Sequence, residues 1–165
     1  MRDIERDKYF MAAAIEEAKK CALLDEVPVG AVVVHDNKII SSSGNGRETF
    51  KDATCHAETD AIRNACRALG GWRLVDCELF VTLEPCIMCA GAIINARVPA
   101  VIIGARDPKA GAFGSFTDIN ALAVNHHPEL YFGVMEEECA DLLRKFFREK
   151  RERGIRWKKQ MKNEE

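Results

Sequence analysis

The chain has 165 residues, is 47% hydrophobic and carries a net charge of −2, which supports one domain with a substantial core. No apolar run approaches the length of about 18 residues that a membrane-spanning helix needs, and the charged N-terminal residues 1–8 do not form a signal peptide. The seven cysteines are scattered among apolar neighbours, as expected for thiols in a reducing compartment. We therefore expect a cytoplasmic protein.

The N-terminal half is predicted to form a helix, a hairpin and a second helix. Apolar residues at helical spacing predict an amphipathic helix over residues 7–23. Two short β-branched runs around a turn predict a hairpin over residues 31–40. Polar, glycine-rich residues 41–52 are predicted to form a loop, and residues 56–69 a helix with Thr54 as its N-cap.

The C-terminal half is predicted to alternate strands and helices. The predicted elements are strands at residues 78–83, 99–104 and 130–134 and helices at residues 85–96 and 135–150. Residues 105–129, interrupted by Gly, Pro and Asp, are predicted to form a lid or partner-contact loop. Strands alternating with helices predict a layered α/β domain with a sheet of about five strands.

Two short motifs offer three metal ligands and one carboxylate. His56, Cys86 and Cys89 are ligands that zinc prefers, and three protein ligands leave a fourth position for water, as in catalytic sites. Cys86 and Cys89 are spaced to share a helix face, and Pro85 suits the first position of that helix. His56 and the proposed catalytic Glu58 are two residues apart, so both can address one metal only from the first turn of their helix. We therefore predict two helix N-termini at one zinc ion.

A lone C-x-x-C pair has two other common interpretations, half of a structural zinc knuckle and a redox pair. Here there is no second C-x-x-C, and the partner motif is H-x-E. Cys55, next to His56, would project from a neighbouring face, so we predict that it is a packing residue. The combination H-x-E…P-C-x-x-C is the signature of zinc nucleobase deaminases. A non-catalytic zinc module that binds RNA is the alternative from another class, but it would leave Glu58 without a role.

The charge is strongly asymmetric along the chain. Residues 144–162 contain ten Lys or Arg and two Glu, a net charge of +8, whereas residues 1–143 sum to −8. This basic block predicts a contact with a polyanion. The alternative is a solvated helix end whose positive charges suit the helix dipole. Beside a nucleobase deaminase motif, the block favours nucleic acid.

These motifs closely resemble those of the bacterial tRNA-specific adenosine deaminases, within the cytidine deaminase superfamily. The resemblance covers about residues 7–153 and rests on Glu26-Val-Pro-Val-Gly30, Asn45, the two metal motifs, Gly104 to Lys109, Asn125-His126 and Phe146-Phe147. The metal motif defines only the superfamily, whereas Gly104 to Lys109 and the Phe-Phe-Arg end with its basic tail indicate the tRNA branch. The chain departs from the family at Cys55, where a small non-thiol residue is usual, and over residues 122–130.

The resemblance implies a three-layer α/β/α fold with a mixed sheet, one zinc ion per subunit, and a homodimer. The implied reaction converts the wobble adenosine of a tRNA anticodon to inosine. Glu58 would take a proton from water, pass it to the purine N1 as hydroxide attacks C6, and then protonate the leaving amine. Asn45 and the backbone at Val29 and Ala57 would bind the base edge, although an Asn in Ser-Gly-Asn-Gly is otherwise typical of a turn.

Further candidates for RNA contact are Arg106, Asp107, Lys109, Asn125, Phe147 and Arg151. A carboxylate near RNA phosphates repels them unless it accepts a hydrogen bond from a 2′-hydroxyl, so we predict that Asp107 helps distinguish RNA from DNA. Its alternative role is that of a turn residue before Pro108. Phe146 and Phe147 cannot both be exposed on one helix, so at least one is predicted to lie in the core.

The nearest rival function is the same chemistry on a free base or nucleoside, as in a guanine, cytidine or deoxycytidylate deaminase. The basic block argues against this function, because a small-molecule enzyme does not need such a charge.

Overall fold

The computed structural model of the chain describes residues 2–163, with side chains described as far as Arg156. In chain order the elements are α1 (Ile4–Leu23), β1 (Gly30–His35), β2 (Lys38–Gly44), α2 (Arg47–Phe50), α3 (Ala57–Leu69), β3 (Cys77–Leu83), α4 (Ile87–Asn95), β4 (Ala100–Ala105), the 3-10 helix η1 (Ile119–Ala121), β5 (Glu129–Phe132) and α5 (Glu136–Asn163). The strands form one sheet in the order β2-β1-β3-β4-β5. Strand β1 pairs antiparallel with β2 and β3, whereas β3, β4 and β5 run parallel, so the sheet is mixed.

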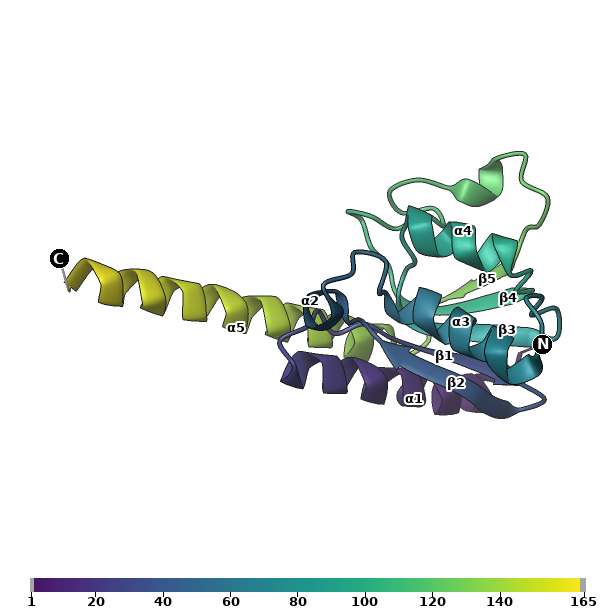
Figure 1. Ribbon diagram of the computed structural model, residues 1–165, viewed down its shortest axis with the longest axis horizontal. Coiled ribbons are helices and arrows are strands. Elements are labelled where there is room, and N and C mark those ends of the chain that lie inside the picture. The colour runs from purple at the N-terminus through teal and green to yellow at the C-terminus, as the bar shows by residue number, and fades with distance from the viewer. Residues whose placement is uncertain (1, 164–165) are drawn as a thin grey trace.

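Helices cover both faces of the sheet. In Figure 1, α1 and the first part of α5 lie along one face, and α3 and α4 lie along the other. Alternate residues of β1 belong to two separate buried clusters: Ala31 and Val33 pack with α3 and α4, and Val32 and Val34 pack with α1 and α5. Burial on both faces explains why β1 is a continuous apolar run. The predicted three-layer fold with a five-stranded mixed sheet is confirmed.

Two glycines allow helices of one layer to approach the sheet closely. A Cβ atom on Gly30 of β1 would lie 1.9 Å from the carbonyl oxygen of Ala14 in α1. A Cβ atom on Gly104 of β4 would lie 2.4 Å from Sγ of Cys139 in α5. Any larger residue at either position would push the helix away from its strand. The two glycines therefore set the positions of α1 and α5 on the sheet.

Residues 41–52, predicted to form a loop, are more regular than expected. Strand β2 continues to Gly44, and the short helix α2 follows at Arg47–Phe50. The strand was missed because its serines lack the apolar alternation by which strands are recognised. Ser41 Oγ donates to the Ala61 carbonyl of α3 at 2.5 Å, so a polar contact joins this part of β2 to the neighbouring helix. The loop prediction was wrong for these two segments.

Helix α5 is longer than predicted, because it runs to Asn163 rather than to about residue 150. Its second half is rich in Lys, Arg and Glu, which are strong helix formers, and the single Gly154 does not interrupt it. In Figure 1 this part of α5 projects away from the rest of the molecule. The basic block at residues 144–162 lies within α5, and its side chains beyond Arg156 lie outside the described part. Within residues 2–163, no helix is both long and apolar enough to cross a membrane.

Candidate active site

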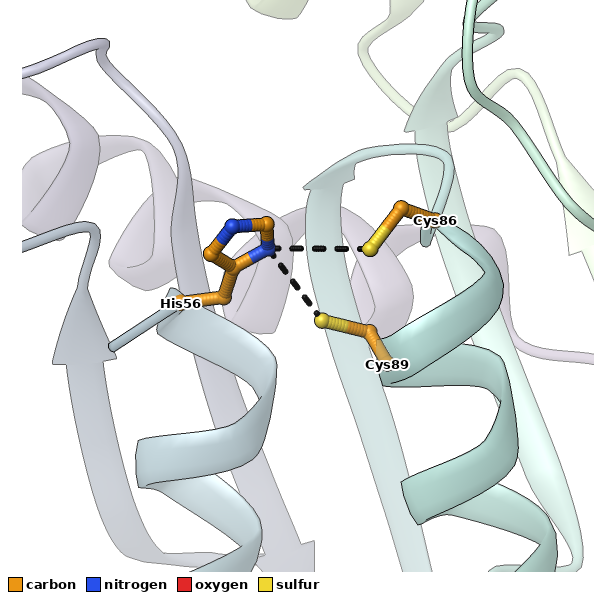
Figure 2. A group of neighbouring side chains, drawn as sticks. All are labelled: His56, Cys86 and Cys89. Atoms are coloured by element: carbon orange, nitrogen blue, oxygen red, sulfur yellow. Dashed lines mark hydrogen bonds between the residues drawn. The ribbon is translucent and has the colours of Figure 1, made fainter. Parts of the chain in front are cut away.

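The three predicted metal ligands come from the starts of two helices. His56 is the N-cap residue of α3, Cys86 is the N-cap residue of α4, and Cys89 lies in the first turn of α4. Figure 2 shows the imidazole and both thiols directed toward one another from these helix ends. Both predicted starts were misplaced, since Thr54 lies before the observed cap and Pro85 precedes Cys86 rather than taking the first helical position. The predicted convergence of two helix N-termini is confirmed.

The spacing of the three ligand atoms suits a tetrahedral zinc ion. The Sγ atoms of Cys86 and Cys89 lie 3.7 and 3.4 Å from Nδ1 of His56, and all three atoms lie within 4.8 Å of one another. Tetrahedral bonds of about 2.3 Å to sulfur and about 2.0 Å to nitrogen separate those two atoms by about 3.5 Å. The donors and their spacing therefore fit zinc and leave a fourth coordination position.

The two thiols differ in acidity. Hydrogen bonding to Cys89, assisted by His56, lowers the pKa of Cys86 to about 3. The hydrogen bond to Cys86, together with burial, raises the pKa of Cys89, and the neighbouring Cys86 raises the pKa of His56. The positive end of α4 also favours a thiolate, which is the form that binds metal. The protein alone therefore favours one thiolate at this site.

Glu58 lies beside the three ligands, in the first turn of α3, and is only 4% exposed. It lines the same cavity as His56 and Cys86. Burial raises the pKa of the Glu58 carboxyl to about 7. A carboxyl with this pKa can accept and return a proton near neutral pH. We refer to His56, Glu58, Cys86 and Cys89 as the metal corner.

A cavity of about 870 Å³ is lined by three residues of the metal corner, His56, Glu58 and Cys86, and opens toward solvent. Its other walls come from the loop that follows β4, from one face of α5, and from four residues near β1 and β2, namely Val27, Val29, Asn45 and Arg47. Most of the residues predicted to bind substrate or RNA line it, namely Val29, Asn45, Ala57, Arg106, Asp107, Lys109, Phe147 and Arg151. The fold thus brings the residues predicted to act in catalysis and those predicted to bind substrate or RNA to the wall of one cavity.

Asn45 offers an unused hydrogen-bond acceptor at this cavity. Its side chain is buried, Nδ2 donates to the Val27 carbonyl at 3.3 Å, and Oδ1 has no partner among the described residues. Its backbone N–H donates to the Val29 carbonyl at 3.0 Å, which holds the residue in place. A buried acceptor without a donor is costly unless a ligand supplies one. Ala57 adds a backbone N–H at the first position of α3, where no partner exists within the helix.

The loop after β4 combines a turn with a cavity wall. Asp107 Oδ1 accepts hydrogen bonds from the backbone N–H groups of Lys109 and Ala110, at 3.0 and 3.3 Å. The turn role that was the alternative for Asp107 is therefore present. Asp107 also lines the cavity, so a turn role does not exclude contact with substrate. Beside it, the guanidinium of Arg106 lies 3.9 Å from the centre of the Phe132 ring.

Helix α5 contributes more residues to the cavity than predicted. Phe147 is 42% exposed and lines the cavity, whereas Phe146 is 5% exposed and lies in the core, as one of the pair was expected to do. Arg144 and Arg148 lie on the same wall as the predicted Arg151. These three arginines, which we call the basic rim, share one helix face at spacings of four and three. That periodicity is the signal from which the two missed arginines could have been found.

Three other residues complete the comparison with prediction. Asn125 does not reach the cavity and lines a separate depression beside α4. Cys55 is buried next to the site, donates to Asp60 at 2.9 Å and is not one of the three clustered ligands, in agreement with a packing role. Arg47 of α2 lines the cavity and was missed, because residues 41–52 were predicted to be an irregular loop.

Fold and site together define the class of protein. A histidine and a C-x-x-C pair at two helix starts, with a glutamate two residues after the histidine, are the functional groups of zinc-dependent nucleobase deaminases. Residues 4–105 match the family model for the cytidine and deoxycytidylate deaminase zinc-binding region.

Comparison with individual proteins narrows this class. A tRNA-specific adenosine deaminase of Bacillus subtilis (strain 168) is 47% identical over 149 residues, which are 90% of this chain and 92% of that protein. A solved structure from studies of A-to-I editing by tRNA:A34 deaminases at the wobble position of transfer RNA is 44% identical, with a TM-score of 0.78, over 82% of this chain and 99% of that one. A guanine deaminase from Bacillus subtilis is 42% identical, with a TM-score of 0.58, over 59% of this chain and 63% of that one. The chain belongs to the tRNA-specific adenosine deaminase family.

Proposed function

We propose that this protein hydrolyses adenosine to inosine at the wobble position of a tRNA anticodon, with the whole chain acting as one zinc-dependent deaminase domain. The observation that carries this proposal is the single cavity that joins the metal corner to the basic rim of α5. A free base needs only the corner, whereas a base within a polynucleotide also presents phosphates to the rim. Such a substrate would place the enzyme in the cytoplasm.

His56, Cys86 and Cys89 would hold one zinc ion per subunit, since their atoms have the identity and spacing that zinc requires. When bound, zinc supplies Lewis acidity that makes water a competent nucleophile near neutral pH. The thiolate favoured at Cys86 suits binding of the zinc ion. The two helix N-termini stabilise negative charge at the site.

Glu58 would carry the protons of the reaction. It removes a proton from the attacking water and delivers it to N1 of the base as the new bond to C6 forms. It then transfers the second proton of that water to the 6-amino nitrogen, the C6–N bond breaks, and ammonia leaves behind a C6 carbonyl. The position of Glu58 supports this role, because it is buried and lines the cavity together with His56 and Cys86.

Asn45 and Ala57 would orient the base. The partnerless Oδ1 of Asn45 can accept an N–H from the base, and the free backbone N–H of Ala57 can donate to one of its acceptors. A base in a single-stranded anticodon loop can be turned outward into such a cavity at little cost in lost stacking. Asp107 would accept a hydrogen bond from a 2′-hydroxyl and the arginines of the basic rim would bind phosphates; their position on the wall of the same cavity supports both roles.

We further propose that the protein acts as a homodimer. Several large apolar side chains of α4 and of the segment after β4 are exposed, including Ile87, Phe116 and Leu122. Exposed apolar surface of this kind is typical of protein interfaces. Light scattering of the purified protein should give the mass of two chains, and the mass of one chain at micromolar concentration would contradict the proposal.

A guanine deaminase is the second candidate, because a solved enzyme of that activity is 42% identical over part of this chain. The basic rim argues against it, since guanine carries no phosphate.

The deciding experiment is deamination by the zinc-loaded protein, measured as ammonia released and, for the adenosine substrates, as inosine formed. The substrates are a tRNA with a wobble adenosine, the same tRNA with a wobble guanosine, and free adenosine, cytidine and guanine. We expect conversion of the wobble-adenosine tRNA alone. Turnover of guanine with no change in the tRNA would replace the proposal with the second candidate.

A further inference from the structure

Another buried glutamate, Glu84, lies at the junction of β3 and α4, directly before Pro85 and the ligand Cys86. It is 2% exposed. Its Oε1 accepts the backbone N–H groups of Phe113 and Ser115 at 3.0 and 3.1 Å. Its Oε2 accepts the backbone N–H of Asp107 at 3.1 Å and also the Ser115 hydroxyl. One carboxylate thus binds the loop that follows β4 near its start, at Asp107, and again at Phe113 and Ser115.

These four donors account for the acceptor capacity of the Glu84 carboxylate. Two carboxylate oxygens have about four lone-pair positions, and here each oxygen receives two hydrogen bonds. Burial of a charged carboxylate is tolerated only when it is hydrogen-bonded in this way. Glu84 borders the cavity, but its lone pairs are already occupied, so direct hydrogen bonding to substrate is not its role.

The loop is shaped to surround this carboxylate. A Cβ atom on Gly111 would lie 2.4 Å from Cδ of Glu84 and 2.6 Å from the carbonyl oxygen of Asp107, so only glycine fits there. The backbone N–H of Gly111 donates to that Asp107 carbonyl at 2.9 Å. The turn that presents Asp107 is therefore closed against Glu84.

The same loop is bound to the chain next to the metal corner. The N–H of Ala112 donates to the Pro85 carbonyl at 2.8 Å, and Gly111 pairs with Cys86 as an isolated antiparallel bridge. Glu84 and Pro85, the two residues directly before the ligand Cys86, are thus both hydrogen-bonded to the loop. A shift of the loop relative to Cys86 would break these bonds together.

We propose that Glu84 is a positioning residue that fixes Asp107 and the cavity wall at residues 106–110 relative to the metal ligand Cys86. It acts on the substrate only through that wall. The functional part of this inference rests on the proposed deamination of tRNA, because Asp107 and its neighbours are assigned there to RNA contact. The structural part does not depend on it.

The first test is amide hydrogen exchange of the zinc-loaded protein without RNA, in the wild type and in Glu84→Gln. Glutamine has nearly the shape of glutamate, but its NH2 group is a donor and would face the N–H and O–H donors of the loop, with which it cannot form hydrogen bonds. We expect the amides of Asp107, Phe113 and Ser115 to exchange about 10- to 100-fold faster, while α3 and the zinc content are unchanged. The matched control is Glu78→Gln near the start of β3, at the strand end opposite to Glu84, whose carboxylate pairs with Arg2 and Arg6. Unchanged exchange of the three loop amides in Glu84→Gln would overturn the proposal.

The second test is a double-mutant cycle for deamination of the wobble-adenosine tRNA. If Glu84 acts through Asp107, Glu84→Gln should raise KM more than it lowers kcat, and the double variant with Asp107→Ala should be no worse than the poorer single variant. Losses that simply multiply would show that Glu84 does not act through Asp107.

Two further comparisons keep the outcomes separate. If Glu84→Gln does not fold, Ser115→Ala replaces it in the test. This variant removes one hydroxyl donor and leaves the carboxylate, so the loop amides should again exchange faster than in the wild type, by a smaller factor. Normal exchange in this variant would then count against the proposal. If the wild type deaminates no tRNA, the proposed function fails, and the exchange measurement still decides whether Glu84 holds the loop.

Discussion

The metal corner and the basic rim face the same cavity but are built in opposite ways. The corner is formed by side chains on two helix N-termini, and Glu58 and Cys89 are buried within it. The arginines of the rim are exposed on one face of α5. Bond-making chemistry needs fixed geometry and little water, whereas a polyanion can be attracted by solvated charges. The contrast separates catalysis from recognition within one site.

The two regions should therefore respond very differently to substitution. The three ligand atoms of the corner lie within 4.8 Å of one another and Glu58 is the buried carboxyl beside them, so the loss of any one group cannot be compensated by a neighbour. Exposed charges contribute individually little and act by their number. Substitutions in the corner are expected to abolish activity, and those in the rim to weaken substrate binding by degrees.

The largest effect is expected for Cys89→Ser. Serine is a much poorer zinc ligand than thiolate, so the protein should lose most of its zinc and its activity should fall by more than about 1,000-fold. Metal analysis and inosine formation measure the two losses together. Cys66→Ser, which changes a partly buried cysteine of α3 outside the ligand cluster, should retain both. Full zinc occupancy in Cys89→Ser would remove Cys89 from the ligand set.

Glu58→Gln should nearly abolish turnover while retaining zinc. The amide keeps the size of the side chain but cannot carry a proton, so kcat should fall by about 100- to 10,000-fold. Single-turnover deamination and metal content are the measurements. Glu48→Gln on the exposed surface of α2 is the matched control and should behave as wild type. Substantial activity in Glu58→Gln would assign proton transfer to another group, and loss of zinc would point to a structural role.

Asn45→Ala should have an intermediate effect, because it removes the partnerless buried acceptor from the cavity. We expect kcat/KM to fall by about 10-fold, the usual consequence of losing one hydrogen bond to a substrate group. Steady-state kinetics on the wobble-adenosine tRNA give this value. Asn64→Ala on the exposed side of α3 serves as control. Equal kcat/KM for Asn45→Ala and wild type would favour the simple turn role.

Arg148→Ala and Arg151→Ala should each raise KM for tRNA by only about 2- to 5-fold and leave kcat unchanged. Each should also reduce the slope of log affinity against log salt by about 0.7, the value for one contact to a single-stranded phosphate. Binding measured over a range of salt concentrations tests this. Arg67→Ala, on α3 and outside the cavity, should leave the slope unchanged. A change in kcat instead of KM would show that the arginines of the basic rim act in the catalytic step and not in substrate binding.

The smallest effect is expected for Cys55→Ala. This thiol is buried beside His56, but its hydrogen bond goes to Asp60 and not to the ligand cluster. Zinc content should be unchanged and activity should stay within about 2-fold, because a small buried residue is exchanged for another. A large loss of zinc in Cys55→Ala would show that the residue has a direct part in the site.

The metal corner could be predicted from residue pattern because its geometry is local. The two-residue spacing of His56 and Glu58 restricts the metal to the start of a helix, and the three-residue spacing of the cysteines places both thiols on one helix face. The alternation of strands and helices in turn predicted the layered fold. The pattern of apolar residues did not predict the serine-rich part of β2, because a polar contact joins it to α3 where a strand usually has apolar side chains.

The composition of the cavity wall depended instead on packing between distant segments. The close contact of Cys139 with Gly104 sets where α5 crosses the sheet, and this brings Arg144 and Arg148 into the wall of the cavity that the metal corner also lines. The same packing leaves Asn125 in another depression. Spacing along the chain can group the arginines on one helix face, but it does not determine which part of the fold that face meets, because this follows from which surfaces of separate helices and strands fit together.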